Sequence, residues 1–383
     1  MKNYDCIVIG FGGVGSAALW EAAKRGWSVL GVDQFGPAHD RGSSHGHTRI
    51  IRRAYFEHPS YVPLVERSYE LWNELTRRHR TALEVKPLLI PTGLLQVGHP
   101  GSEVIRGVQA SATQYDLQVE TFSPAQIEQR LPIFNIPPDH IGLFEPAAGI
   151  LRVELCVAAM IGQATKLGAE LASDSAVIGW DVRDDGLVTV ETTTGRFQSR
   201  RLVIAGGPWS SRLLPDLNLP LRVLRKQQQW FQLDRVDQKL VNQFPAFLFE
   251  QDNGDVFYGI PEIDYLGMKV AEHSGGEIVD DPTRLDLELN EPELQRVESF
   301  LKQHLRFGHH RLVHYSECLY TMSPDGHFII DHYPGLKQVS FAAGLSGHGF
   351  KFAPVLGRYL IDLLEDRLDP DFEFLKFGRW LPQ

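Results

Sequence analysis

A glycine-rich segment near the start of the chain could hold a phosphate-bearing cofactor. It reads Gly10-Phe-Gly12-Gly13-Val-Gly15, which fits the spacing G-x-G-x-x-G. In this pattern the first glycine permits a tight turn, the second lets the backbone approach a pyrophosphate, and the third lets a helix pack closely on a strand. Asp33 lies 23 positions after Gly10, where an acid that binds a ribose hydroxyl is expected. These residues predict dinucleotide binding and leave open whether the dinucleotide is NAD or FAD.

A second segment concentrates positive charge. Residues 41–53 hold four arginines and two histidines in a chain whose net charge is −10. Such a density indicates either a site for a carboxylate or phosphate, or a basic loop exposed to solvent. A zinc site at His45 and His47 is not expected, because further ligands at suitable spacing are missing.

Two groups of chemically active residues follow near the C-terminus. His310, His314 and Cys318 recur every four residues, so they would share one side of a helix, and also of the strand that their neighbours favour. No fourth ligand is evident, and we do not expect a metal. Residues 344–351 combine three glycines with Lys351, which suits a backbone close to a ligand and a lysine paired with a carboxylate, or a loop that only turns the chain.

These residues need elements that position them. The apolar run Cys6–Ile9, the Ala- and Leu-rich stretch 16–25 and the apolar run 28–32 predict a strand, a helix and a strand around the glycine loop, with Gly26 at the helix end. The run 203–209 predicts a strand that ends in small residues, and this strand could pass close to a cofactor or simply turn. Apolar spacing further predicts helices at 61–80, 154–166, 291–305 and 355–364.

Strand signals are scattered between these helices, and no linker separates them. Strands are expected within 88–97, 187–204 and 244–270, with hairpin turns at Thr194-Gly195 and Asn253-Gly254. The length of 383 residues suits two domains, and the composition, 43% hydrophobic and 22% charged, is that of a globular protein. We therefore expect two domains whose chain segments interleave.

Composition also bounds the partners and the compartment. The acidic balance, with a sequence pI near 5.8, does not favour nucleic-acid binding. Three widely spaced cysteines do not form a disulfide framework, and no signal peptide or membrane span is evident. We expect a cytoplasmic protein that binds neither nucleic acid nor membrane.

Four segments together resemble the family of monomeric sarcosine oxidases and N-methyltryptophan oxidases, which carry covalently bound FAD. The segments are the N-terminal glycine loop, residues 41–52 (RGSSHGHTRIIR), residues 318–331 and residues 344–353 (GLSGHGFKFA). They occur in the family's order and span nearly the whole chain. The sequence of residues 141–145 and of Gly344-Leu345 is more similar to the N-methyltryptophan branch.

The resemblance implies an α/β fold, with a Rossmann-like FAD-binding domain and an interleaved substrate domain built on a mixed sheet. The FAD-binding domain would comprise residues 1–85, 150–220 and 320–383, and the substrate domain residues 86–149 and 221–319. FAD would be attached as a thioether between its 8α-methyl group and Cys318. Besides the glycine loop and Asp33, the implied cofactor-binding residues are Ser43, Ser44, Arg49, Val177, Cys318, Gly347, Gly349 and Lys351.

Further functional positions carry over from the family by matching residues. Arg52 and Lys351 would bind the substrate carboxylate, and Lys269 would stabilise superoxide that forms beside the reduced flavin. The substrate side of the flavin would be lined by Tyr258, His273 and Tyr320, and its opposite face by His45 and Arg49.

The implied reaction is the oxidation of an N-methyl amino acid, such as N-methyltryptophan or sarcosine, by oxygen. The products would be the primary amino acid, formaldehyde and hydrogen peroxide, and the enzyme is expected to be a monomer. His47, Arg53 and Gly326 stand where family members commonly have Asp, His and Glu, which leaves the substrate open. A pipecolate-like or fructosyl amino acid is an alternative substrate, and a NAD-linked dehydrogenase is a more distant alternative.

Overall fold

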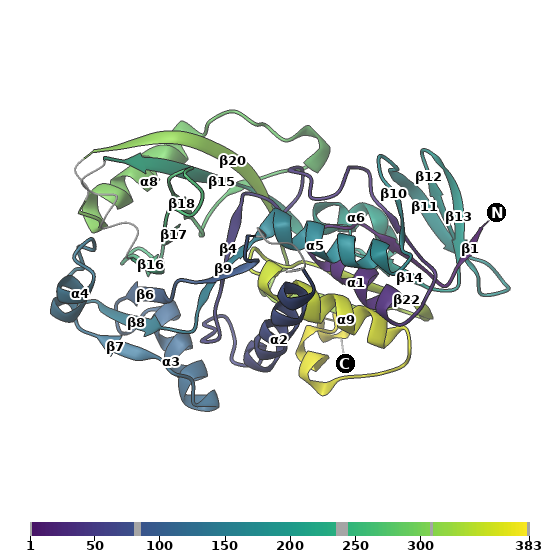
Figure 1. The fold of residues 1–383 in the computed structure, drawn as a ribbon, viewed down its shortest axis with the longest axis horizontal. Coiled ribbons are helices and arrows are strands. Elements are labelled where there is room, and N and C mark those ends of the chain that lie inside the picture. The colour runs from purple at the N-terminus through teal and green to yellow at the C-terminus, as the bar shows by residue number, and fades with distance from the viewer. Residues whose placement is uncertain (1, 80–85, 235–243, 307–308, 381–383) are drawn as a thin grey trace.

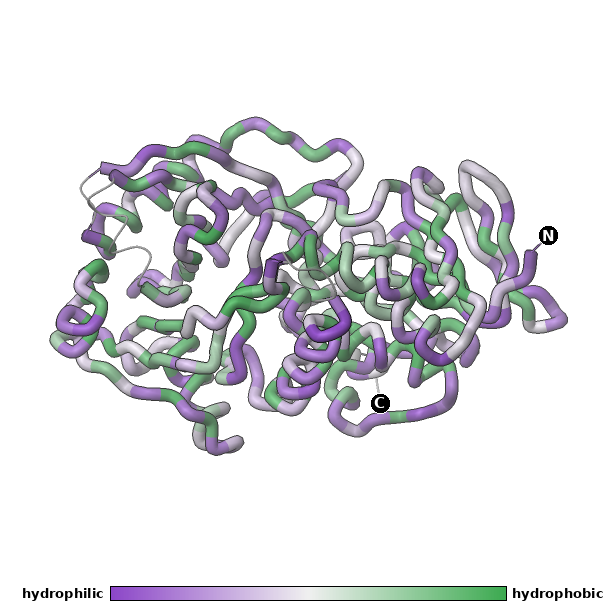
Figure 2. The backbone as a smooth tube through the Cα atoms, viewed as in Figure 1, coloured by the Kyte–Doolittle hydropathy of each residue, from purple (hydrophilic) through white to green (hydrophobic). Residues whose placement is uncertain are grey.

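The computed structural model describes residues 2–79, 86–234, 244–306 and 309–380 (Figure 1). Within these ranges the chain forms four β-sheets with helices packed around them. The predicted helix 61–80 is present as α2 (Tyr61–His79), and Arg80 lies outside the described residues. Figure 2 shows hydrophilic and hydrophobic residues alternating along α2, as its exposed outer side requires.

A six-stranded sheet carries the glycine loop. Its order is β10-β3-β2-β14-β22-β21, in which β21 alone runs antiparallel. Helix α1 (Gly13–Lys24) joins β2 to β3, which confirms the predicted strand–helix–strand unit. The strands of this sheet are β2 (Cys6–Ile9), β3 (Val29–Val32), β10 (Glu170–Ala172), β14 (Leu202–Ile204), β21 (Ile329–Tyr333) and β22 (Leu336–Ala343).

Helices bury one face of this sheet. Helix α1 packs against α5 (Val153–Lys166) and α9 (Ala353–Leu363), and α2 packs on both of these. As predicted, Gly26 terminates α1: its φ is +78°, its N–H donates to Ala23 O, and the Trp27 N–H donates to Ala22 O. This left-handed cap returns the chain directly into β3.

A nine-stranded mixed sheet forms the other half of the molecule. Its order is β19-β15-β18-β17-β16-β6-β8-β7, and β20 pairs along β15. One face packs on α8 (Glu291–His304) and α4 (Pro124–Arg130) through an apolar core, while α3 (Glu103–Tyr115) packs near β6. The strands are β6 (Leu94–Gly98), β7 (Glu120–Phe122), β8 (Ile141–Glu145), β15 (Arg222–Leu233), β16 (Ala246–Glu250), β17 (Val256–Ile260), β18 (Met268–Glu272), β19 (Glu277–Ile278) and β20 (His310–Met322).

Two small sheets complete the fold. The order of the first is β4-β9-β5 and that of the second is β1-β13-β12-β11. Both predicted hairpins are present, and Gly254 has a φ of +86° in the turn between β16 and β17. The strands are β1 (Asn3–Tyr4), β4 (Thr48–Ile51), β5 (Leu89–Pro91), β9 (Gly149–Arg152), β11 (Val177–Val182), β12 (Val188–Thr192) and β13 (Gly195–Ser199).

The expectation that His310, His314 and Cys318 share one side of a strand is wrong. In β20, Leu312 pairs with Phe231 and His314 pairs with Trp230, so Val313 is an extra residue, a β-bulge. The bulge reverses the alternation, and His310 therefore faces the side opposite to His314. Residues four apart in a strand are also about 13 Å apart, so these side chains do not surround one ion.

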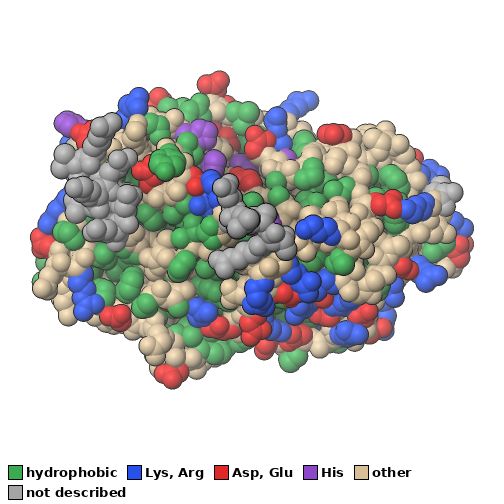
Figure 3. All heavy atoms as spheres, viewed as in Figure 1, with side chains coloured by type: hydrophobic (Ala, Val, Ile, Leu, Met, Phe, Trp, Pro, Cys, Tyr) green, Lys and Arg blue, Asp and Glu red, His purple; other side chains and the backbone are tan. Residues whose placement is uncertain are grey.

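Acidic and basic side chains are mixed on the surface. On the face shown in Figure 3, they are mixed over α2 and beside it rather than forming one basic area. Ion pairs such as Arg67 with Asp371 and Arg78 with Glu74 account for part of this mixture. No helix within the described ranges is both long and apolar enough to cross a membrane.

Candidate active site

A cavity of about 320 Å³ opens where the parallel strands β2, β3 and β14 end. The carboxyl ends of parallel strands are the usual ligand site of such sheets. The small residues that follow β14, at 205–209, also line the cavity. The lining includes most of the predicted cofactor-binding residues, namely Gly10, Gly12, Gly13, Asp33, Ser43, Ser44, Arg49, Val177, Cys318, Gly347 and Gly349.

The N-terminus of α1 fits a pyrophosphate. Gly12 is its N-cap without a side-chain cap, and its first turn holds no acidic residue. Ser44 Oγ accepts a hydrogen bond from Gly13 N–H at 2.9 Å, and the following N–H groups of the first turn and the positive end of the helix dipole remain for an anion. A Cβ added to Gly13 would lie 3.0 Å from the Phe350 ring, so glycine keeps this approach open. The residues present fit the phosphate part of a dinucleotide.

Gly15 does not line the cavity but packs the helix. A Cβ at this position would lie 1.7 Å from the carbonyl oxygen of Gly10, and Gly10 itself has a φ of +80°. The third glycine of the motif thus lets α1 approach the end of β2, as the sequence predicts.

We expect Gly15→Ala to lower the affinity for the dinucleotide by roughly tenfold or more and to lower Tm, because α1 must move away from β2. Cofactor content and Tm of the purified variant measure both effects. Gly162→Ala is the matched control, since a Cβ there meets nothing within 4 Å in α5. A Gly15→Ala protein with the cofactor content and Tm of the control would contradict this account of the loop.

Asp33 lies at the cavity with its carboxylate oriented by the backbone. It accepts hydrogen bonds from the N–H groups of Phe11 and Phe35, both at 2.9 Å. Burial raises its pKa, although these hydrogen bonds act in the opposite direction. Each oxygen retains a lone pair, so the carboxylate can also accept a bond from a ribose hydroxyl.

Cys318 lines the cavity next to a partly buried cation. Its side chain is buried at 1% exposure, and Arg49 Nη2 lies 3.1 Å from Cys318 Sγ. Arg49 also donates to the carbonyl oxygens of Ser43 and Thr48, which hold the guanidinium in place. A thiolate formed at Cys318 would receive a charge-assisted hydrogen bond here.

His45 is close to this end but does not line the cavity. Its Nε2 lies 3.1 Å from the carbonyl oxygen of Gly42. Burial and the neighbouring Arg49 lower the pKa of His45 to about 4, so the imidazole is neutral at pH 7.

Lys269 is a buried lysine held by the basic segment. It projects from β18, and its Nζ donates to the carbonyl oxygens of Gly46 at 2.8 Å and Thr48 at 3.0 Å. The ammonium group also lies 5.3 Å from the centre of the Trp230 ring. Burial and Arg49 lower its pKa well below that of an ordinary lysine.

Arg52 and Lys351 both lie beside Tyr55. Arg52 Cζ is 4.2 Å and Lys351 Nζ is 5.2 Å from the centre of the Tyr55 ring. Arg52 Nη2 contacts both carboxylate oxygens of Glu57, at 2.8 and 2.7 Å. Lys351 donates to His348 O at 2.9 Å. The two cations that the sequence predicts for a carboxylate are therefore together, and a protein carboxylate is already beside one of them.

Burial and neighbouring charges together set the pKa values of Lys351 and Glu57. Burial and Arg52 lower the pKa of Lys351 to about 7, although Glu57 acts in the opposite direction. For Glu57, Arg52, His348 and Lys351 overcome the effect of burial and lower its pKa to about 2. Glu57 is therefore ionised at pH 7, and Lys351 is protonated in only part of the molecules.

His273 and Tyr320 meet in the structure, as the resemblance implies. His273 Nδ1 lies 3.3 Å from Tyr320 Oη. Tyr320 lines the cavity, whereas His273 and Tyr258 lie behind it on or next to strands of the nine-stranded sheet. Burial lowers the pKa of His273 to about 4, so a neutral imidazole faces this region at pH 7.

The arginines of segment 41–53 do not converge on one anion. Arg41 is exposed near Asp40, Arg49 contacts Cys318, Arg52 pairs with Glu57, and Arg53 pairs with Glu66. Arg41 thus fits the interpretation as a basic loop exposed to solvent, whereas the buried Arg52 is placed beside a carboxylate. Its strand β4 alternates side chains between two environments, which charge density alone does not show.

Sequence alone did not indicate several residues of the site. Glu57 and Tyr55 follow the basic segment directly, so a carboxylate five residues after Arg52 was the available signal. Trp209 and Phe350 line the cavity beside glycines of segments 203–209 and 344–351. Their signal was an aromatic residue next to a glycine turn.

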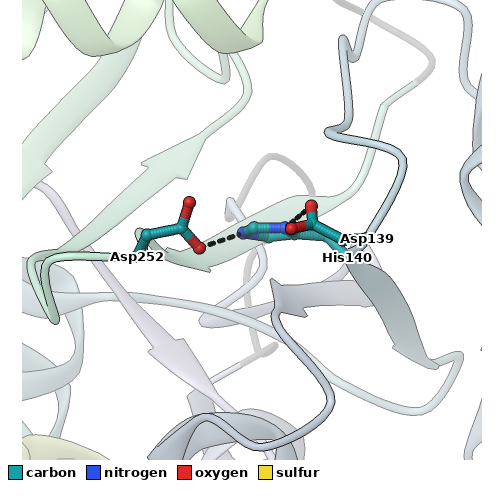
Figure 4. A group of neighbouring side chains, drawn as sticks. All are labelled: Asp139, His140 and Asp252. Atoms are coloured by element: carbon teal, nitrogen blue, oxygen red, sulfur yellow. Dashed lines mark hydrogen bonds and ion pairs between the residues drawn. The ribbon is translucent and has the colours of Figure 1, made fainter.

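A histidine between two carboxylates lies outside this site (Figure 4). His140 Nδ1 is 3.0 Å from Asp139 Oδ1, and its Nε2 is 3.7 Å from Asp252 Oδ1. The imidazole packs against Phe249, which belongs to the apolar core on the α8 side of the nine-stranded sheet. That face is opposite to the one that bears Lys269.

Comparison with known proteins identifies the class. A family model described as FAD dependent oxidoreductase matches residues 5–363, and the chain belongs to this family. The cofactor is therefore FAD, and the nicotinamide alternative is excluded. The α/β fold with a Rossmann-like FAD-binding part is confirmed.

The relatives confirm the resemblance seen in the sequence. The chain is 40% identical to the monomeric sarcosine oxidase of Streptomyces avermitilis over 365 residues, which cover 94% of this chain and 93% of the relative. It is 38% identical to the N-methyl-L-tryptophan oxidase of Escherichia coli over 378 residues, 98% of each chain. These nearly equal identities leave the choice of branch as a prediction.

Solved structures share the fold. NikD, described as an unusual amino acid oxidase essential for nikkomycin biosynthesis, superposes with a TM-score of 0.85 at 23% identity, covering 98% of each chain. Fructosamine oxidase of Aspergillus fumigatus has a TM-score of 0.78 at 18% identity and covers 98% of this chain and 89% of its own.

Proposed function

We propose that the protein is an FAD-dependent oxidase of N-methyl amino acids. A secondary amino acid, oxygen and water would give the primary amino acid, formaldehyde and hydrogen peroxide. The relatives named sarcosine oxidase and N-methyl-L-tryptophan oxidase support this reaction. The observation that carries the proposal is the pair of buried cations, Arg52 and Lys351, that both lie beside Tyr55. FAD, when bound, supplies the two-electron oxidation of the N-methyl carbon.

The two cations would select amino acids over plain amines. The substrate carboxylate would bind Lys351 and the N–H groups of Arg52 that are not used in its hydrogen bonds to Glu57 and Ala54 O. Cations near the substrate nitrogen also favour the uncharged amine, which is the form that can be oxidised. We propose Tyr258, His273 and Tyr320 as the neighbouring wall of this site.

Lys269 and Arg49 would serve the other half of the reaction. We propose that Lys269 stabilises negative charge on oxygen while it is reduced, because a fixed cation in a water-poor site acts strongly on developing charge. Its two carbonyl acceptors support this role by holding Nζ in one place. We propose that Cys318, beside Arg49, would hold FAD as a thioether and that His45 positions this segment. Forming this S–C bond would release one proton from the thiol and one from the 8α-methyl group, and the two electrons would pass through the flavin to oxygen.

The domain division predicted from the sequence is proposed as well. No strand of the six-stranded sheet lies within residues 86–149 or 221–319, which supports assigning those segments to the substrate domain. Free, unpaired Cys6, Cys156 and Cys318 support a reducing compartment such as the cytoplasm. We also propose that the protein is a monomer and that its binding partners are its amino acid substrate and oxygen.

The reaction is tested by mixing the purified, FAD-loaded protein anaerobically with N-methyl amino acids. We expect loss of the blue absorbance of the flavin, and in air we expect formaldehyde and peroxide in equal amounts. Pipecolate-like and fructosyl amino acids in the same panel test the alternative substrates. A bound flavin that no member of the panel reduces would overturn the proposed function.

We expect carboxylate binding to weaken as the pH rises through about 7. Below this pH Lys351 is protonated and attracts the anion; above it the charge is lost, so the Kd of propionate should rise roughly tenfold from pH 6 to pH 8. Perturbation of the flavin spectrum by propionate measures the Kd without turnover. Lys351→Met should bind weakly at every pH, and a wild-type Kd that does not change with pH would contradict the role of Lys351.

A further inference from the structure

A row of residues crosses the nine-stranded sheet from Gln96 to the proposed active site. Gln96 in β6 pairs with Leu248 in β16, which pairs with Tyr258 in β17, which pairs with Ala271 in β18. Residues in one such row point to the same face of the sheet, and so does Lys269, two residues from Ala271. Gln96 therefore lies on the face that carries Tyr258 and Lys269.

The residues next to Gln96 in β6 confirm this orientation. Leu95 and Val97 belong to the apolar core on the α8 side, as does Phe247, the partner of Leu95. Because side chains alternate along a strand, Gln96 must point away from that core.

The amide of Gln96 has no hydrogen-bond partner among the residues that the structure describes. Its side chain is fully buried, and neither Nε2 nor Oε1 accepts or donates a hydrogen bond. Its neighbours across the sheet, Leu143 and Leu248, are apolar. Burying an amide with both ends unsatisfied is unfavourable, and buried polar groups of this kind call for an explanation. One carbonyl and two N–H groups remain available to a ligand.

The surroundings of Gln96 connect it to the substrate cations. Leu248 belongs to an apolar cluster with Ala54, and Phe56 packs against this cluster. Ala54 O accepts a hydrogen bond from Arg52 at 3.1 Å, and the Phe56 ring centre lies 4.7 Å from Arg52 Cζ. The apolar cluster around Leu248 therefore connects Gln96 to the residues beside Arg52.

We propose that Gln96 determines specificity by hydrogen bonding to the side chain of the substrate. The preferred substrates are N-methyl amino acids whose side chain carries an amide, a hydroxyl or a ring N–H, rather than sarcosine, which has no side chain. This inference rests on the proposed function and names the substrate class of that site. A site built to bind a polar group rejects an apolar analogue of equal shape, because its own polar atoms are then left unpaired.

The test compares substrate pairs that match in shape. The FAD-loaded enzyme is assayed with N-methylasparagine against N-methylleucine, N-methylthreonine against N-methylvaline, and sarcosine. We expect kcat/KM to favour the polar member of at least one pair by about tenfold or more. In Gln96→Leu this ratio should fall to about one through a higher KM of the polar member, while kcat/KM of sarcosine changes less than about twofold.

A second measurement separates specificity from a structural role. Since Gln96→Leu removes an unsatisfied buried amide, its Tm should stay the same or rise. Gln229→Leu is the matched control: this buried glutamine pairs with Val270 and therefore points to the α8 side, so its substitution should keep the substrate ratio. Gln96→Met serves as a second variant with an unbranched side chain.

Three outcomes would overturn the proposal. They are a wild-type ratio near one in both pairs, a ratio retained in Gln96→Leu and Gln96→Met, and an equal loss for all substrates with a lower Tm. If wild-type enzyme oxidises no N-methyl amino acid, the proposed function fails instead. In that case the Kd values of the same pairs are measured by perturbation of the flavin spectrum. The ratio of Kd between the apolar and the polar member of each pair, in wild type and in Gln96→Leu, then tests the role of Gln96.

Discussion

Lys269→Met is expected to slow reoxidation of the reduced enzyme by oxygen by roughly 100- to 1,000-fold, because it removes a fixed cation where negative charge develops. Reduction by substrate in the absence of oxygen should change far less. Methionine has a similar length and is apolar, and the carbonyl oxygens of Gly46 and Thr48 lose a donor in this variant. Stopped-flow mixing of substrate-reduced enzyme with oxygen measures the rate.

The pH dependence gives a second signature of the same residue. Burial and Arg49 lower the pKa of Lys269, so its positive charge should be lost at a lower pH than in an ordinary lysine. The reoxidation rate of the wild type should therefore fall as the pH rises through that lowered pKa, and the rate of Lys269→Met should not. Lys226→Met removes a second buried cation of the same sheet, which lies opposite Cys318 and donates to Ser274 O at 2.5 Å, so a smaller effect in this variant would assign the oxygen role to Lys269 in particular. If both half-reactions slow equally in Lys269→Met, the residue has no special role with oxygen.

Cys318→Ala is expected to abolish covalent attachment of FAD. Acid precipitation of the wild type should leave the yellow colour in the pellet, whereas that of the variant should release it into the supernatant. The proximity of Arg49 Nη2 to Cys318 Sγ explains why this cysteine, and not another, would react. Cys156→Ala provides the comparison, because Cys156 is buried in α5 and its Sγ faces Leu88 O. Colour that stays with the Cys318→Ala pellet would place the link elsewhere.

Local patterns in the sequence predicted much of the fold. The turn at Gly10, the helix after it and the cap at Gly26 depend on residues close together in the chain, and all are present. The hairpin at Asn253-Gly254 is also local. The bulge at Val313 was not predictable, because it arises from the pairing of β20 with the distant strand β15. A one-residue change in register reverses which side chains face together.

The candidate site divides along the same line. Motif residues such as Cys318 and Lys351 were found because the resemblance and their neighbouring glycines indicate them. The sequence did not indicate Glu57 or Gln96. Glu57 matters because it contacts Arg52, and Gln96 matters because its amide has no hydrogen-bond partner among the described residues. Burial without a hydrogen-bond partner is a property of the folded structure, and composition or periodicity does not reveal it.

Because Cys318 lies on β20, covalent attachment of FAD would report on correct folding of the protein. Strand β20 pairs with β15 in the nine-stranded sheet, while the glycine loop follows β2 in the six-stranded sheet. A cofactor that rests on the loop reaches this thiol only in molecules whose two sheets have assembled correctly. The fraction of protein with covalently bound flavin would then equal the fraction of correctly folded molecules. A misfolded chain would carry no covalent flavin even with FAD in excess.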